Sequence, residues 1–390
     1  MLTASEEEAM QASGRARPAF SRLVHVGAPN IGSRARFHEL VDGVLDANWL
    51  TNDGPLVRRL EATLATYLGV RECVAVCNGT VALEIAVRCL GLAGEVIVPS
   101  LTFVASASAL EWLGVRPVFC DVDPETYCID PDAVEELVSP RTSGILGVHL
   151  FGRPCDVEAL SEIAARHRLS LFFDAAHAFG CSSRGRMIGN FGACEVFSFH
   201  ATKFFNTIEG GAIATNDPEL AHRARLARNF GYEDGEVRGL GINGKMNEIC
   251  AAMGISNFES LQKFIDCNKH NHDMYRAALA TVPGLRVAEY DEAEKNNHQY
   301  VVVEVLPECA QTRDQIMQVL RENNVLARSY FSPGCHCVEP HCSNLVGEPR
   351  LPHTVALCDR LLILPTGTCV SSEDIITIAA LVRDAAQGTA

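Results

Sequence analysis

The chain has 390 residues, 47% of them hydrophobic, which is enough for one large domain plus a smaller one, or for two comparable domains. Its 33 lysines and arginines against 48 aspartates and glutamates give a formal net charge of −15, which disfavours nonspecific binding to nucleic acid or to anionic membranes. An anionic ligand must therefore be held by local devices, such as helix N-termini or single basic side chains.

The N-terminal stretch MLTASEEEAMQASGRARPAF is acidic and then mixed, without the basic start and apolar run of a signal peptide. We interpret residues 1–21 as a flexible segment. No later stretch approaches the roughly 20 apolar residues of a membrane span. Most of the 16 cysteines sit singly inside apolar runs, where a thiol packs as a small hydrophobe. We therefore expect a reduced, cytoplasmic protein with neither a membrane nor a nucleic-acid partner.

Residues 22–265 read as a large α/β domain. Short apolar runs predict strands, and segments with apolar residues at three-to-four spacing predict helices between them. The strands are expected at 73–77, 95–99, 115–122, 143–151, 169–175, 194–199 and 212–215, and the helices at 80–92, 132–138 and 156–168. Such an alternation indicates a mostly parallel, seven-stranded sheet with helices on both faces. In such sheets ligands bind beyond the carboxyl ends of the strands.

The remainder of the chain predicts a second, smaller unit. Apolar residues at helical spacing from Lys245 onward indicate one long amphipathic helix over 245–265. A strand at 300–306, a helix near 312–323 and a closing helix near 371–386, which begins at Ser371 or Ser372, follow it. These elements predict a separate small α+β domain over residues 266–390. Residues 22–50 are a further candidate for packing on that domain.

Three of the predicted strand ends carry polar groups that a ligand could use. One buried strand passes through Asn78, Gly79 and Thr80 directly into a helix, whose free amides and positive dipole end form an anion site. Another apolar strand ends on Asp174, which needs a cationic or hydrogen-bonding partner to stay ionised. Lys203 follows a third strand, and desolvation there would turn its amine into a nucleophile able to form a Schiff base. Taken singly, a helix cap, a turn cap and a solvated lysine explain these residues better.

Together the three strand ends describe one ligand. A phosphate fits Gly79 and Thr80, a basic ring nitrogen fits Asp174, and an aldehyde fits Lys203. Pyridoxal 5′-phosphate (PLP) carries these three groups, and an aspartate and a Schiff-base lysine are the contributions expected of a protein that binds it.

The sequence also resembles the nucleotide-sugar aminotransferases of the DegT/StrS type, within the aspartate-aminotransferase (type I) fold of PLP enzymes. The resemblance runs from NWLTNDGPLV (48–57) to LPT (364–366), and so covers most of the chain. Its ordered motifs include NGTVAL, VPSLTFVAS, FDAAHAFG, FSFHATKFFNTIEGG and GINGKMNEICAAMG. No single motif is specific, but the ordered set is.

The resemblance implies how the cofactor would be held. The amides of Gly79 and Thr80 and the hydroxyl of Ser198 would bind its phosphate. Phe103 would stack on the pyridine ring, and Asp174 would hold the ring nitrogen.

Three further roles follow from the same resemblance. Lys203 would carry the cofactor and move the proton during catalysis. His177, where many relatives have glutamine, would contact the phenolic oxygen, and its protonation would alter the cofactor's own pKa. Asn243 would reach the phosphate bound by the neighbouring subunit, so that a homodimer with shared active sites is the smallest active unit.

The implied activity moves an amino group from L-glutamate to a keto group on a nucleotide-linked deoxysugar, with ping-pong kinetics and pyridoxamine 5′-phosphate as the intermediate cofactor form. The stretches GAPNIG (27–32) and NWLTNDGP (48–55) resemble members associated with 4-amination. We therefore expect dTDP-4-keto-6-deoxyglucose as the acceptor and the 4-amino-4,6-dideoxy sugar as the product, with a 3-keto acceptor as the alternative. A PLP-dependent sugar dehydratase and a non-catalytic regulatory protein are further alternatives. The family's dehydratases replace the lysine with histidine, so Lys203 favours transamination.

Two other motifs are less informative. GLGINGKM (239–246) matches nucleotide-binding glycine patterns, but no strand precedes it and Met246 stands where a P-loop needs Ser or Thr. It is interpreted as a loop that enters the long helix. CHCVEPHC (335–342) is rich in metal-ligand residue types, but its spacing matches no standard zinc pattern, so we predict no metal site. The resemblance makes His336 a substrate contact.

Overall fold

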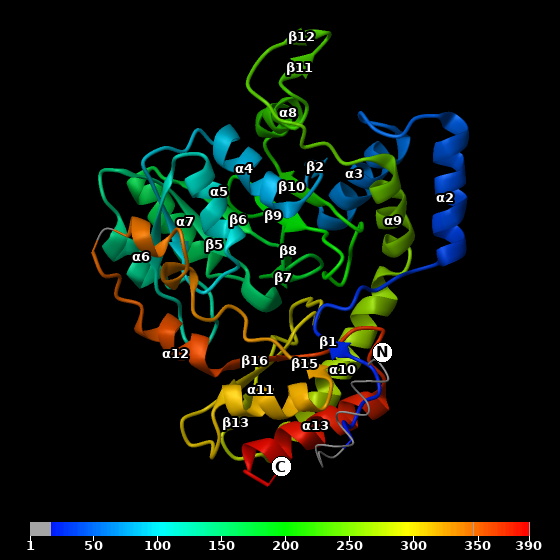
Figure 1. The fold of residues 1–390 in the computed structure, drawn as a ribbon. Coiled ribbons are helices and arrows are strands. Elements are labelled where there is room, and N and C mark those ends of the chain that lie inside the picture. The colour runs from blue at the N-terminus through cyan, green and yellow to red at the C-terminus, as the bar shows by residue number, and fades with distance from the viewer. Residues whose placement is uncertain (1–16, 346, 390) are drawn as a thin grey trace.

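The computed structural model describes residues 17–345 and 347–389 (Figure 1). Of the segment 1–21 that was expected to be flexible, residues 1–16 lie outside the described residues. In the described part of the chain, no helix has the length and apolar character needed to cross a membrane. The cytoplasmic location expected from the sequence stays a prediction.

The centre of the molecule is a seven-stranded sheet in the order β2-β10-β9-β6-β5-β3-β4. Strand β10 is antiparallel to both of its neighbours, and the other adjacent pairs are parallel. Each of the seven predicted apolar runs forms one of these strands, so the α/β class and the mostly parallel sheet are confirmed. The strands are β2 (Glu72–Val76), β3 (Glu95–Pro99), β4 (Arg116–Cys120), β5 (Thr142–Val148), β6 (Ser170–Asp174), β9 (Glu195–Ser198) and β10 (Gly211–Thr215).

Helices cover both faces of this sheet. Alternate residues of a strand point to opposite faces, and Phe172 and Phe173 of β6 accordingly belong to two different core clusters. On the Phe172 face lie α4 (Gly79–Cys89), α5 (Ala105–Trp112) and α8 (Pro218–Ala227). The opposite face packs against α3 (Pro55–Leu68), α6 (Pro131–Leu137), α7 (Val157–His167) and α9 (Glu248–Phe258).

A three-stranded antiparallel sheet forms a second body, which Figure 1 shows below the central sheet. Its strands are β13 (Leu285–Val287), β14 (Val301–Val305) and β16 (Leu361–Leu364), and its core also includes α10 (Leu261–Leu279), α11 (Arg313–Glu322) and α13 (Ser372–Ala386). Ser371 caps α13 by accepting the amide of Asp374, as the sequence predicted. Strand β1 (Val24–His25) pairs with β15 (Val325–Leu326), whereas α2 (Arg34–Ala47) packs on α9.

The remaining elements are short and lie between the helices and strands named above. They are the hairpins β7 (Ser182–Ser183) with β8 (Arg186–Met187) and β11 (Tyr232–Glu233) with β12 (Glu236–Val237), the helix α12 (Pro352–Arg360), and the single turns η1 (Leu150–Gly152), η2 (Cys335–Cys337) and η3 (Cys342–Asn344).

The prediction of one long helix over 245–265 is wrong. The stretch begins as a loop, Asn247 caps α9 by accepting the amide of Cys250, and the helix ends before a break at Ser260, whose φ of −110° and ψ of 6° are not helical. Apolar residues keep their spacing across the break, so periodicity alone could not detect it. Helix α10 then continues through the expected domain boundary at residue 265, and the division into domains at that point stays a prediction.

Candidate active site

A cavity of about 550 Å³ lies at the carboxyl ends of the central strands. It is also lined by Tyr300, Tyr330 and Phe331, which come from or near the smaller sheet. The structure therefore brings together residues that are more than 200 positions apart in the chain. The predicted site residues that line it are Gly79, Thr80, Phe103, Asp174, His177, Ser198 and Lys203, whereas Asn243 does not.

The first turn of α4 forms one end of this cavity. The side chain of Asn78 accepts the amide of Val81 at 2.8 Å, so the cap satisfies the third amide of the helix. No acceptor among the described residues takes the amides of Gly79 and Thr80, which remain available at the positive end of the helix. A Cβ on residue 79 would lie 2.9 Å from Cβ of Ser198, so only glycine leaves this cradle open. The turn thus has the donors and the space for a phosphate.

Asp174 is buried at the end of β6 and is held by two donors. Its Oδ2 accepts the hydroxyl of Ser106 at 2.8 Å, and its Oδ1 accepts the amide of Ala176 at 3.0 Å. Because the Ser106 proton points to the carboxylate, the hydroxyl of Thr102, 2.9 Å away, donates to Ser106. The expected hydrogen-bonding partners of Asp174 are therefore neutral donors, which fix the orientation of its carboxylate and stabilise its negative charge.

Lys203 is the cationic group at the centre of the cavity. Burial lowers the pKa of its amine to about 8, although the nearby Asp174 raises it. Its Nζ donates to the hydroxyl of Tyr300 at 3.5 Å. Burial raises the pKa of Tyr300 well above its ordinary value, so this phenol stays neutral and cannot form an ion pair with the lysine. A large fraction of Lys203 is therefore an uncharged amine near pH 8.

His177 lies in an aromatic wall of the cavity. Its ring stacks on Phe151 and Phe331 at centroid distances of 5.9 and 5.8 Å, and it lies 4.5 Å from the ring of Tyr300. Burial lowers the pKa of His177 well below 6.5, and the charge of Lys203 lowers it further. The Nδ1 atom accepts the amide of Phe151 at 3.3 Å, so the neutral ring carries its proton on Nε2 and can donate from there.

The other two predicted residues are exposed. Phe103 is 57% exposed at the rim of the cavity, with its ring 6.1 Å from that of Phe331. Asn243 lies in the loop before α9 and forms an isolated bridge with Asn229. Its predicted contact with a neighbouring subunit stays a prediction.

Sequence reasoning did not assign Ser106 or Tyr300. Ser106 lies three residues after Phe103 in the quoted motif, at a helix start, where a hydroxyl could have been aligned with Asp174. Tyr300 is 97 positions away from Lys203, next to a strand of the smaller sheet, and no local pattern points to it.

The two histidines of the stretch 335–342 contact other protein groups. Nδ1 of His336 lies 2.7 Å from the hydroxyl of Ser100, and the ring does not line the cavity. His341 is buried beside Glu111, with 3.0 Å between Nδ1 and Oε2. Within residues 17–345 and 347–389, no group of three or more His, Cys, Asp and Glu side chains is arranged to hold a metal ion.

Comparison with known proteins identifies the family. The model of the DegT/DnrJ/EryC1/StrS aminotransferase family matches residues 33–383. The crystal structure of DesI in the presence of its TDP-sugar product is 47% identical, with a TM-score of 0.91 over 95% of both chains. The dTDP-4-amino-4,6-dideoxy-D-glucose transaminase of Shigella dysenteriae is 35% identical over 93% of this chain and 98% of that protein. The GDP-perosamine synthase of Caulobacter vibrioides is 33% identical over 92% of this chain and 96% of that protein. The chain therefore belongs to the DegT/DnrJ/EryC1/StrS aminotransferase family, and it is a PLP-dependent aminotransferase of fold type I, as the resemblance in its sequence predicted.

Proposed function

We propose that this enzyme transfers an amino group from L-glutamate to the 4-keto group of dTDP-4-keto-6-deoxyglucose, giving the 4-amino-4,6-dideoxy sugar. The observation that carries the proposal is the meeting of Lys203, Asp174 and the free amides of α4 in one cavity. Two relatives support the acceptor, because one is named for a dTDP-4-amino-4,6-dideoxy sugar and the other was solved with its TDP-sugar product.

The cavity fits PLP at each end. The open cradle at Gly79, with its free amides and the nearby Ser198 hydroxyl, suits the phosphate. Asp174 suits the ring nitrogen, and Phe103 at the rim suits a face of the ring. When bound, PLP supplies an aldehyde that takes up the amino group and a ring that stabilises negative charge at the carbon that bears it.

Lys203 provides the acid-base chemistry in this proposal. With its pKa lowered to about 8, the Nζ atom is neutral often enough to remove the proton from the amino-bearing carbon of the donor. The same atom would give that proton to the carbon of PLP that takes up the amino group, and in the second half-reaction it would deliver a proton to the former keto carbon of the sugar. Tyr300 holds Nζ near the centre of the cavity through its hydroxyl.

The other residues orient and desolvate the reacting groups. Asp174 keeps its negative charge directed into the cavity because Ser106 and Ala176 hold its two oxygens. His177 stays neutral and donates from Nε2, so it orients an oxygen without adding charge next to Lys203. The aromatic wall that contains His177 and Phe331 excludes water from that side.

We also propose a homodimer in which Asn243 completes the partner's site. Asn243 is exposed and outside its own cavity. Large apolar side chains are exposed near Asn243 in two loops, which are linked by the hydrogen bond from Arg228 to Asp53. Their exposure supports a surface that contacts a second subunit. These side chains are Trp49, Leu50, Phe230, Leu240 and Ile242. Light scattering after size exclusion should give twice the chain mass of 42.3 kDa, and a monomer that retains full turnover would contradict this proposal.

One experiment tests the cofactor and the donor. The purified protein, loaded with PLP, is followed by visible absorbance before and after the addition of L-glutamate. We expect the long-wavelength band to bleach as the amino group is taken up. A protein that stays colourless with PLP supplied would overturn the proposal and favour the non-catalytic alternative.

A second experiment tests the acceptor. The PLP-loaded enzyme, supplied with L-glutamate, is mixed separately with the dTDP-linked 4-keto sugar, its 3-keto isomer and a GDP-linked 4-keto sugar. The amino-sugar product is then quantified. We expect the dTDP-linked 4-keto sugar to give the highest kcat/KM. Faster amination of the 3-keto isomer, preference for the GDP sugar, or release of water in place of amine transfer would each select a different alternative.

A further inference from the structure

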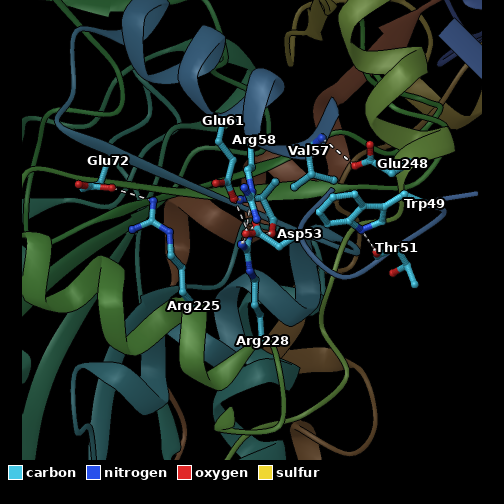
Figure 2. A network of polar contacts seen from close by, with 11 residues as sticks. Trp49, Thr51, Asp53, Val57, Arg58, Glu61, Glu72, Arg225, Arg228 and Glu248 are labelled. Carbon is cyan, nitrogen blue, oxygen red and sulfur yellow. Dashed lines mark hydrogen bonds and ion pairs between the residues drawn. The ribbon is translucent and has the colours of Figure 1, made fainter. Parts of the chain in front are cut away.

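A buried ion pair closes the outer edge of the central sheet beside the cavity. Strand β2 is the last strand on that side. Glu61 of α3 and Arg228, which follows α8, meet over the middle of β2, and Figure 2 shows their side chains converging there. Nη1 of Arg228 donates to the carbonyl of Ala75 at 2.6 Å, and Glu61 accepts the amide of Ala75 at 2.8 Å. The two side chains therefore bind both the amide and the carbonyl of Ala75, which would otherwise have no partner at the edge of the sheet.

The amide of Cys77, directly after β2, is held by backbone hydrogen bonds alone. The amide of Cys77 donates to the carbonyl of Gly244 at 2.8 Å, and the amide of Gly244 donates to the backbone carbonyl of Arg228 at 2.9 Å. The edge is thus tied at Ala75 and at Cys77. The strand then passes into Asn78 and Gly79, the turn with the free amides.

Arg228 also holds the loop before α3. Its Nη2 donates to Asp53 at 3.2 Å, and Arg58 donates to the other oxygen of Asp53 at 3.0 Å. Asn52 and Asp53 have φ angles of 65° and 59°, a left-handed backbone that needs outside contacts to persist. Figure 2 shows Asp53 of this loop beside the side chains of Arg228 and Arg58.

The start of α3 is fixed from another direction by Glu248. Its carboxylate accepts the amides of Leu56 and Val57 at 2.8 and 2.9 Å. Glu248 is buried, and it takes the place of a capping side chain that Gly54 lacks. The helix that carries Glu61 therefore cannot easily slide relative to the sheet.

We propose that Arg228 and Glu61 are a positioning pair that fixes the phosphate end of the active site. Neither side chain lines the cavity, so they act through β2 on the amides of Gly79 and Thr80. The inference deepens the proposed function and rests on it. Loss of one partner leaves an uncompensated charge at the strand edge, which must move or admit water. The turn that follows would lose its alignment with a bound phosphate, whereas Asp174 and Lys203, on β6 and after β9, would keep theirs.

The test compares two ligands that differ only in the phosphate. Dissociation constants of the apoprotein for PLP and for pyridoxal, which lacks the phosphate, are measured by absorbance in the wild type and in Arg228→Gln. We expect PLP binding to weaken about tenfold or more, since displacement of a binding group by ~1 Å has effects of this order. Pyridoxal binding should change less than about threefold, because Lys203 and Asp174 are unaffected. Arg228→Lys should recover part of the PLP affinity.

Arg116→Gln is the matched control. It removes one partner of the buried Glu95 at the opposite ends of the strands, where no residue lines the cavity. This variant should leave the ratio of the two dissociation constants unchanged. If Arg228→Gln does not fold, the double variant Glu61→Met with Arg228→Met replaces it, because loss of both charges leaves none unpaired. The double variant should show the same selective loss of PLP affinity, because it also removes both hydrogen bonds to the backbone of Ala75.

The outcomes separate the inference from the proposed function. If the wild type binds neither PLP nor pyridoxal, the proposed function falls, and this inference with it. If the wild type binds PLP and the Arg228 variants weaken both ligands equally, or weaken neither, only the positioning role is overturned.

Discussion

In the described part of the chain, the carboxylate of Glu95 is paired with opposite charges at the amino ends of the central strands, whereas Asp174 and Lys203 at the carboxyl ends are not. At the amino ends, Glu95 of β3 accepts Arg141 and pairs with Arg116, and both arginines reach solvent. At the carboxyl ends, Asp174 and Lys203 form no ion pair within 4.0 Å with any of the described residues, and both contact neutral hydroxyl groups. Charge is neutralised inside the protein at one end of the sheet and is left for a ligand at the other.

The pKa shifts follow this difference. Burial raises the pKa of Glu95, but hydrogen bonds from Arg141 and Ser139 and the charge of Arg116 outweigh it, so that the net shift is downward. Burial lowers the pKa of Lys203, and the charge of Asp174 does not compensate. A group that is desolvated without a full counter-charge marks a reactive site more reliably than a paired one. The predictions below change one end of the sheet at a time.

Removal of the lysine should have the largest effect. Lys203→Ala should lower kcat by about 10³-fold or more, because no other side chain supplies the proton transfer. The product is quantified by chromatography, and circular dichroism checks that the variant folds. Turnover within tenfold of the wild type would show that Lys203 is not the acid-base group.

Neutralisation of the aspartate should rank second. Asp174→Asn keeps the size of the side chain but loses the charge, and we expect kcat/KM to fall about 10²-fold. Ser106→Ala removes only one donor to Asp174 and should cost about tenfold. Steady-state kinetics of both variants show which one loses more kcat/KM. A larger loss in Ser106→Ala than in Asp174→Asn would contradict the role given to the carboxylate.

The pH dependence should be the next effect in size. Only the neutral amine of Lys203 reacts with an aldehyde, and its pKa is about 8. The rate of PLP uptake by the apoprotein should therefore rise about tenfold per pH unit below that pKa and level off above it. Free N-acetyl-lysine amide, measured over the same range, corrects for the ionisation of PLP itself.

His177 provides an internal check on that profile. Because its pKa lies well below 6.5, it stays neutral across the range, and His177→Gln should leave the midpoint unchanged. A midpoint near 10.5, the ordinary value for lysine, would mean that the amine is not desolvated in solution.

The sequence predicted the sheet well because its strands are buried on both faces. In the run 169–175, the three residues directly before Asp174 (Leu171, Phe172 and Phe173) are apolar and buried, as expected of a strand covered on both faces. The break between α9 and α10 was missed because it changes the backbone at Ser260 without changing the apolar spacing. Periodicity reports which face is buried and is insensitive to a local kink that preserves that face.

The same reasoning explains what could be predicted of the site. Gly79, Asp174 and Lys203 each follow a strong strand signal, so their common location follows from the parallel topology. Tyr300 and Arg228 reach their partners from elements distant in sequence, and nothing near them in the chain indicates those contacts. Contacts between distant elements depend on packing, which a pattern in one sequence does not encode.

The smallest effect should come from the amino ends, and it tests whether the two ends of the sheet are independent. Arg116→Gln leaves Glu95 with Arg141 and Ser139, so the carboxylate is still paired after the change. We expect the free energy of unfolding to fall by about 1 kcal/mol, since a partly exposed ion pair contributes little more. Urea titration gives this value, and kcat/KM should stay within about twofold of the wild type because the cavity lies at the other end of the strands.

The pH dependence of that difference identifies its cause. The folded-state pKa of Glu95 is lowered from 4.5, so its paired carboxylate stabilises the fold above that pH, and this contribution is lost as the pH falls below it. The gap in unfolding free energy between the wild type and Arg116→Gln should therefore narrow in acid. If the difference in unfolding free energy does not change with pH, its cause is the lost packing of the aliphatic part of the Arg116 side chain. A loss of PLP affinity comparable to that of Arg228→Gln would instead show that charge at the amino ends also controls the site, and the contrast between the two ends would not hold.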